Sequence, residues 1–269
     1  MRINTNMNAM LATNNMAKNT ALAGTAMEKL SSGLRINKAG DDAAGLAISE
    51  KMRSQMRGME QANRNVQDGV SMVQTAEGAL EEAGNIAQRM RELTVQGGNG
   101  TLTAADQTKI ETELTALGEE ILQIGNETKF NEKALLDGTN ATVTIQAGAN
   151  DETRTVTLFD LKTAAGAVQN LKVTDNTVAL ASQDAVDVIL ESISTNRAQL
   201  GATQNRLEAT SSNLTTSTEN LTAAESRIRD VDVAKEMVNL SKLNLLSQAA
   251  QAMVGQAKQQ PEGVIQLLR

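Results

Sequence analysis

Apolar side chains recur at strict seven-residue intervals over the last third of the chain. The positions are Val186, Ile193, Leu200, Leu207, Leu214, Leu221 and Ile228. A seven-residue repeat keeps one face of an α-helix apolar, so the pattern predicts a single helix over residues 186–231, about 70 Å long at 1.5 Å per residue. The stripe three residues further on is polar in its middle, at Asn196, Thr203 and Thr210. We therefore expect a bundle rather than an independent leucine zipper, with Leu200, Leu207, Leu214 and Leu221 in its core.

Two further helices precede this one and supply its partners. Apolar residues step by three and four from Ala62 to Met90, and this helix is broken by the glycines of segment 97–100. Thr103 and Asp106 then have the spacing of a capping box, and Ile110, Leu114, Leu117 and Ile121 follow on one helix face before Gly125. The connection between these two helices is short, so we expect them to be antiparallel.

The period changes from three or four residues to two between residues 141 and 158. Val143 and Ile145 alternate with threonines, and a second alternating run follows a Gly-Ala-Asn-Asp turn at 148–151. This pattern predicts a β-hairpin. Residues 162–185 have weak periodicity, and we expect a loose connection there.

Both chain ends read as amphipathic helices with thin apolar stripes. Leu22, Leu30 and Leu34 lie near the front, and Leu243, Leu246 and Met253 lie near the back. Neither end buries enough surface alone to offset its ordering entropy, so we expect both to be disordered in the monomer and to fold on meeting a partner. The predicted fold class is mainly α: a long antiparallel helical bundle or coiled coil with a small β-hairpin, flanked by N- and C-terminal helical arms that pair.

The composition removes most catalytic chemistry. The chain has 269 residues with no Cys, His, Trp or Tyr, which excludes a Ser-His-Asp triad, a Cys nucleophile and the usual zinc ligands. We expect no enzyme, no cofactor and no metal site, and we assign Asp41 and Asp42 to helix capping rather than to a cation. The net charge of -7 argues against a nucleic-acid partner, and no continuous apolar stretch argues for a membrane span.

Several segments resemble the bacterial flagellin family over nearly the whole chain. The most specific is the run Leu30-Ser-Ser-Gly-Leu-Arg-Ile-Asn-Lys-Ala-Gly-Asp-Asp-Ala-Ala-Gly-Leu-Ala-Ile48, supported by the start Met1-Arg-Ile-Asn-Thr-Asn6 and the ending Val264-Ile-Gln-Leu-Leu-Arg269. The long outer domains of larger flagellins have no room here. The chain is therefore similar to the short type of Bacillus and its relatives.

The resemblance implies a structural subunit that self-assembles into the extracellular filament of the bacterial flagellum, the propeller for motility. It implies an inner filament domain of residues 1–42 and 232–269, and an outer helical domain of residues 43–231. The implied partners are further copies of the chain, an export chaperone with the type III export apparatus, and cap and junction proteins. Assembly would involve Leu243, Leu246, Met253, Leu267, Leu268 and Arg269. The alternative is a hook–filament junction protein with similar terminal helices.

The segment Gln88–Gln96 resembles the part of flagellins that the vertebrate Toll-like receptor 5 recognises. By this resemblance Arg89 and Leu93, with Glu113 of the neighbouring helix, would form the contact patch. Arg89 and Leu93 are four residues apart, so we expect them to share an exposed helix face. The simpler interpretation is a solvated face of the bundle.

Overall fold

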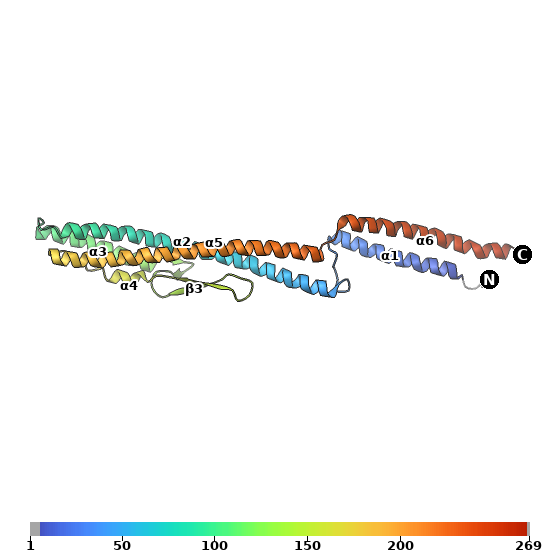
Figure 1. Ribbon diagram of the computed structural model, residues 1–269, viewed down its shortest axis with the longest axis horizontal. Helices are drawn as coiled ribbons and strands as arrows, with labels where there is room; N and C mark the ends of the chain where they lie inside the picture. Colours follow the sequence, from blue (N-terminus) through green and yellow to red (C-terminus); the bar gives the residue numbers. More distant parts are fainter. Residues whose placement is uncertain (1–5, 268–269) are drawn as a thin grey trace. The chain divides into compact units, whose positions relative to one another are not determined.

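The computed structural model describes residues 6–267, with side chains up to residue 259, and it is predominantly helical (Figure 1). The predicted Leu267 side chain, Leu268 and Arg269 lie outside this description. The chain forms two compact units, one of Met1–Ser54 with Asn220–Arg269 and the other of Gln55–Glu219. We call them the terminal unit and the bundle unit. The mainly α fold class predicted from the sequence is confirmed.

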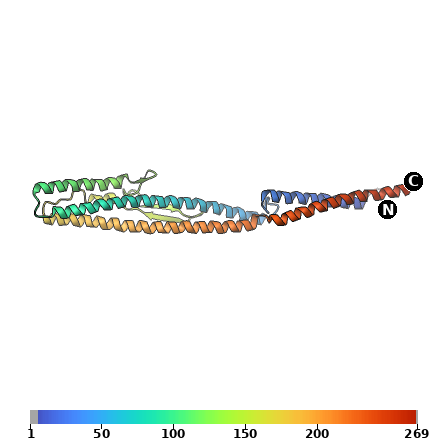
Figure 2. The ribbon, with the colours of Figure 1, turned by 90° about the horizontal axis from the view of Figure 1, so that it is seen from above.

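The bundle unit contains one long helix and the greater part of two others, which lie side by side in both views (Figures 1 and 2). They are α2 (Ala43–Gly97), α3 (Ala104–Glu127) and α5 (Asn176–Arg229). Helix α3 begins at an N-cap, Thr103, whose side chain accepts a hydrogen bond from the backbone N–H of Asp106. Both α3 and α5 run antiparallel to α2 (Figure 1). The antiparallel direction of α3 relative to α2, predicted from the short connection, is correct.

The heptad stripe of α5 supplies one side of the core. Leu200, Leu207 and Leu214 are buried together with Val66, Val73, Leu80 and Met90 of α2, and with Ile110, Leu114 and Ile121 of α3. Leu221 is only partly buried, and it lies in the terminal unit. The core therefore closes at Leu214, one heptad before Leu221, the last core residue predicted from the sequence.

Two small hairpins cover the bundle. Strands β3 (Thr142–Gln146) and β4 (Thr153–Thr157) pair antiparallel in the register Thr142 to Thr157, as the alternation predicts. Strands β1 (Lys129–Phe130) and β2 (Lys133–Ala134) form a second hairpin that the sequence analysis missed. Its two turn residues, Asn131 and Glu132, both have positive φ, 48° and 65°, as in the tight turns that suit the twist of a hairpin.

The loose connection expected over residues 162–185 is wrong. Helix α4 (Leu161–Gly166) packs on α3, and α5 already begins at Asn176. Leu171 and Val173 are buried, and the backbone N–H of Val173 donates to the Glu111 carboxylate at 3.0 Å. A six-residue helix followed by a turn and irregular backbone buries residues at no regular spacing. Such a segment has no period for sequence analysis to detect.

The terminal unit pairs the two ends of the chain. Helices α1 (Met7–Ser32) and α6 (Val233–Leu267) run antiparallel beside each other (Figures 1 and 2). Near the start of α1, the Asn6 side-chain amide donates to the Ala257 carbonyl at 2.6 Å. At the other end Leu34 and Asp230 form an antiparallel bridge, with the Val231 N–H donating to the Gly33 carbonyl at 3.0 Å. The pairing of the arms expected from the sequence is present.

Candidate assembly and recognition surfaces

The paired terminal helices carry apolar side chains that the chain itself does not cover. Among the described residues of α1 and α6 the exposed large apolar side chains are Met7, Met10, Leu11, Leu22, Met27, Val233, Met237, Val238, Leu245, Leu246 and Met253. By contrast, the buried apolar residues of the terminal unit in the described part of the chain are Ala26, Ile36 and Leu243. Large contiguous exposed apolar patches are typical of interaction sites on soluble proteins. We call this set the exposed apolar surface.

The assembly residues predicted from the sequence fall into two groups. One group lies in the contact between α1 and α6, which we call the seam, and the other belongs to the exposed apolar surface. Leu243 is 7% exposed and belongs to the seam, whereas Leu246 is 43% and Met253 is 59% exposed. Met253 also lines a groove between α1 and α6. The groove has a volume of about 390 Å³, and its other lining residues are Asn8, Leu11, Ala12, Asn15, Ala250, Gln256 and Ala257.

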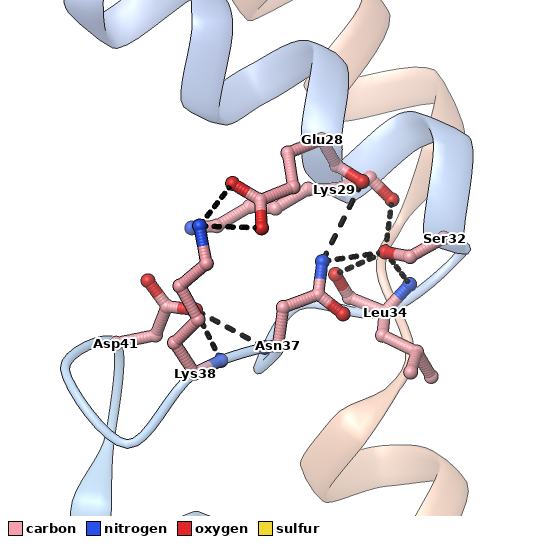
Figure 3. A network of polar contacts seen from close by, with 7 residues as sticks. All are labelled: Glu28, Lys29, Ser32, Leu34, Asn37, Lys38 and Asp41. Atoms are coloured by element: carbon pink, nitrogen blue, oxygen red, sulfur yellow. Dashed lines mark hydrogen bonds and ion pairs between the residues drawn. The ribbon is translucent and has the colours of Figure 1, made fainter.

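A polar network joins the end of α1 to the segment that follows it (Figure 3). The Lys38 ammonium lies 2.7 Å from the Glu28 carboxylate, and this hydrogen-bonded pairing raises the pKa of Lys38. The Asn37 side chain donates to the Ser32 hydroxyl at 2.7 Å. The Asp41 carboxylate accepts from the backbone N–H groups of Lys38 and Asn37, both at 3.0 Å, which lowers the pKa of Asp41.

The adjacent aspartate has the capping role that the sequence analysis gave it. The Asp42 carboxylate accepts from the backbone N–H of Gly45 at 2.9 Å, in the first turn of α2. The same role expected for Asp41 is wrong, because its carboxylate accepts from Asn37 and Lys38 and holds the turn before α2. Over the residues that the structure describes, no cluster of acidic side chains is arranged to hold a metal ion.

An ion pair fixes the end of α5 within the terminal unit. The Arg229 guanidinium lies 2.9 Å from the Glu50 carboxylate of α2, and the Arg229 side chain is only 11% exposed. The Arg229 carbonyl accepts from the backbone N–H of Arg35 at 2.6 Å. Sequence analysis missed this contact, because residues so distant along the chain share no pattern.

The structure brings together two of the three residues of the predicted receptor patch. Arg89 of α2 and Glu113 of α3 form an ion pair at 3.0 Å, with both side chains about half exposed. The hydrogen bonds to Glu113 and then to Glu92 raise the pKa of Arg89. The expected exposure of Leu93 is wrong, since Leu93 is 2% exposed and belongs to the core. Positions 90 and 93 are three apart and both reach the core, so the buried face of α2 is wider than the predicted stripe.

Other ion pairs join α2 and α5 along the bundle. The Arg91 guanidinium lies 2.6 Å from the Asp187 carboxylate, and the Arg197 guanidinium lies 3.3 Å from the Glu81 carboxylate. These pairs could be found from the sequence only after the register of the two helices was known.

No described helix combines the length and the apolar character required to cross a bilayer.

The fold and its surfaces define a helical structural protein with one well-packed bundle and terminal helices that expose apolar side chains. Two family models match the chain: the bacterial flagellin N-terminal helical region over residues 3–141 and the bacterial flagellin C-terminal helical region over residues 183–268. The chain belongs to the bacterial flagellin family.

Individual relatives agree over the full length. A flagellin of Halalkalibacterium halodurans is 54% identical over 272 residues, and one of Bacillus subtilis is 49% identical over 304 residues, with the whole of both chains covered in each case. The crystal structure of Bacillus cereus flagellin is similar with a TM-score of 0.51 and 31% identity, covering 60% of this chain and 94% of that one. The resemblance recognised in the sequence is confirmed.

Proposed function

We propose that the chain assembles with copies of itself into the bacterial flagellar filament through the exposed apolar surface of α1 and α6. The observation that carries the proposal is the contrast between the two units. The bundle unit has a continuous buried core, whereas the paired terminal helices leave residues such as Met7, Leu245 and Met253 more than half exposed. Covering these side chains with neighbouring copies would supply the hydrophobic driving force for polymerisation.

In this proposal residues 1–42 and 232–269 form the inner part of the filament and residues 43–231 form its outer part. Leu246 and Met253, with the chain end Leu267, Leu268 and Arg269, would contact other copies, while Leu243 positions α6 on α1. The filament is extracellular, so the subunit would be secreted through the type III export apparatus with a chaperone. Cap and junction proteins would meet the same terminal segments. The chain would have a structural task and no enzymatic one.

The hook–filament junction is the less supported alternative. The relatives that match over the full length at 54% and 49% identity are both named flagellin. A junction protein forms a short collar and stops, whereas a filament subunit polymerises without limit. Unlimited self-polymerisation is therefore the property that separates the two functions.

Salt-induced polymerisation of the purified monomer, followed by sedimentation and electron microscopy, tests the proposal. We expect long filaments from the wild-type chain and a loss of sedimentable polymer from Leu246→Gln. Leu246 is exposed, so its polar replacement should leave the monomer folded, which circular dichroism checks. Gln248→Ala is the matched control on the same helix, at another exposed position. Wild-type protein that forms only short oligomers, or a Leu246→Gln chain that polymerises like the control, would contradict the proposal.

We further propose that Arg89 and Glu113 contribute to recognition of the monomer by Toll-like receptor 5. The support is the resemblance of the segment and the exposed ion pair that joins α2 to α3. Buried Leu93 would act only by holding α2 in the bundle. We expect Arg89→Ala and Glu113→Ala to weaken binding to the receptor ectodomain at unchanged helicity by circular dichroism, and equal binding by all three proteins would remove the assignment.

A further inference from the structure

The methionines of the chain are unevenly distributed between the two units. Five in the described part of the chain are exposed, and all five lie on α1 or α6: Met7, Met10, Met27, Met237 and Met253, at 64%, 56%, 61%, 51% and 59%. In the bundle unit Met72 is 6% exposed and Met90 is fully buried, whereas Met56 and Met59 are partly buried. Solvent-borne reagents should therefore reach the thioethers of these five methionines most readily and those of Met72 and Met90 least.

A methionine thioether reacts with peroxides to give the sulfoxide, a reversible change. The sulfur lone pair attacks one peroxide oxygen, the O–O bond breaks, a sulfur–oxygen bond forms and water leaves. The sulfur is oxidised and the peroxide is reduced. The product replaces an apolar, flexible side chain with a polar one.

We propose that Met7, Met10, Met27, Met237 and Met253 are sites of reversible oxidation. Hydrogen peroxide converts their thioethers to sulfoxides and thereby blocks assembly of the free subunit. This inference rests on the proposed function, because these side chains belong to the exposed apolar surface of α1 and α6. Met253 lies seven residues after Leu246, on the same face of α6, and it lines the groove between α1 and α6. A sulfoxide there places a polar oxygen where a neighbouring copy needs an apolar contact.

The burial pattern gives the modification a defined selectivity. Exposed thioethers react first, so a limited dose of peroxide changes the terminal unit and leaves the core around Met90 intact. Once copies cover the exposed apolar surface, the same five thioethers are shielded. The free subunit is therefore the sensitive species, and the finished filament is resistant.

Limited treatment of the purified full-length monomer with hydrogen peroxide, followed by removal of the oxidant, tests the inference. Peptide mass spectrometry should find more sulfoxide at the five exposed methionines than at Met72 and Met90. Salt-induced polymerisation should be lost, with helicity by circular dichroism retained. Treatment with both methionine sulfoxide reductases, which together act on the two sulfoxide epimers, should restore polymerisation. Peroxide applied to preformed filaments should oxidise the five positions more slowly.

Two further measurements locate the effect. A variant with leucine at all five positions keeps their approximate size and apolar character, and it should polymerise after peroxide treatment. In a partly oxidised wild-type sample, sulfoxide at the five positions should be enriched in the supernatant over the pelleted polymer. This second measurement needs no substitution, so it remains decisive if the five-leucine variant fails to fold.

The outcomes separate the two proposals. Untreated monomer that does not polymerise would overturn the proposed function and this inference with it. Untreated monomer that polymerises, with oxidised monomer that polymerises equally well and no enrichment in the supernatant, would overturn this inference alone. A five-leucine variant that polymerises untreated but is still inactivated by peroxide would also overturn it, because the sensitive methionine would then lie elsewhere.

Discussion

At the scale of single residues, burial separates positions that the sequence pattern treats as equal. Leu207 and Leu214 occupy successive heptad positions, but Leu207 is 1% exposed and Leu214 is 9% exposed. Leu214 also lines an open groove of about 410 Å³ beside Met59 and the turn of the β3–β4 hairpin. A side chain beside an open groove leaves a smaller closed cavity when it is shortened.

Leu207→Ala should therefore destabilise the bundle more than Leu214→Ala does. We expect a loss of about 2 to 5 kcal/mol in the free energy of unfolding for Leu207→Ala, the range for a fully enclosed leucine. Thr203→Ala is the control on the same helix, since the Thr203 hydroxyl donates to the Gln199 carbonyl of its own helix. Chemical denaturation measures the free energy of unfolding of the three variants. A loss for Leu207→Ala no larger than that for Thr203→Ala would mean that Leu207 is not part of the core.

The turn before α2 gives a prediction about pH. The backbone N–H groups of Lys38 and Asn37 lower the pKa of the Asp41 carboxyl below its ordinary value of 3.8. A lowered folded-state pKa means that Asp41 stabilises the turn above the unfolded-state pKa and that this contribution is lost as the pH falls through the folded-state value. An NMR titration of the Asp41 carboxyl carbon should give a lower midpoint in the folded chain than in denaturant. Identical midpoints would show that the two hydrogen bonds do not form.

At the scale of elements, periodicity in the sequence predicted only those helices and strands that have a regular repeat of apolar residues. The long helices and the β3–β4 hairpin follow from sustained three-four, seven and two-residue repeats. The segment at 162–185 and the β1–β2 hairpin do not, because their residues are fixed by individual contacts such as that of Val173 with Glu111. The receptor patch shows the same limit. The family resemblance placed Glu113 with Arg89, and the structure pairs them, whereas the burial of Leu93 depends on how wide a face α2 buries.

Helix packing makes two helical glycines differ in what they tolerate. A Cβ added at Gly118 of α3 would lie 2.9 Å from the Val168 carbonyl oxygen and 3.2 Å from the Gln169 Cα, both backbone atoms just after α4. A Cβ at Gly78 of α2 would meet nothing within 4 Å. Gly118 therefore allows the close approach of α4 and the backbone that follows it, whereas Gly78 has no packing task.

Substitution by alanine should move stability in opposite directions at these two positions. Gly78→Ala should stabilise the bundle by about 0.5 to 1 kcal/mol, the usual gain at an exposed helix interior. Gly118→Ala should destabilise it by about 1 to 3 kcal/mol, the usual cost of overpacking. Urea denaturation of both variants checks the signs, and a gain at Gly118 would mean that the backbone after α4 is free to move away from α3.

At the scale of the whole chain, buried apolar surface is concentrated in one of the two units. The core cluster runs from Ala62 to Leu214, entirely within the bundle unit. The terminal unit buries Ala26, Ile36 and Leu243 among its described apolar residues and exposes most of the rest. Because conformational entropy opposes the ordering of every residue, the bundle unit should hold most of the stability of the monomer. The seam between α1 and α6 should open at a much lower cost.

This difference predicts that the terminal unit opens first in the free subunit and becomes protected on assembly. In hydrogen exchange of the monomer, amides of α1 and α6 should exchange much faster than those around Leu80, Leu114 and Leu207. Brief trypsin treatment should remove the ends of the chain and leave a helical fragment containing the bundle unit.

In the polymer, the amides of α1 and α6 should exchange more slowly, since neighbouring copies would cover the exposed apolar surface and raise the free energy of opening. The bundle amides are the internal control, as their protection should change little on assembly. Equal protection of both units in the monomer would mean that the thin seam is sufficient on its own, and the exposed apolar surface would then have no role in ordering the ends of the chain.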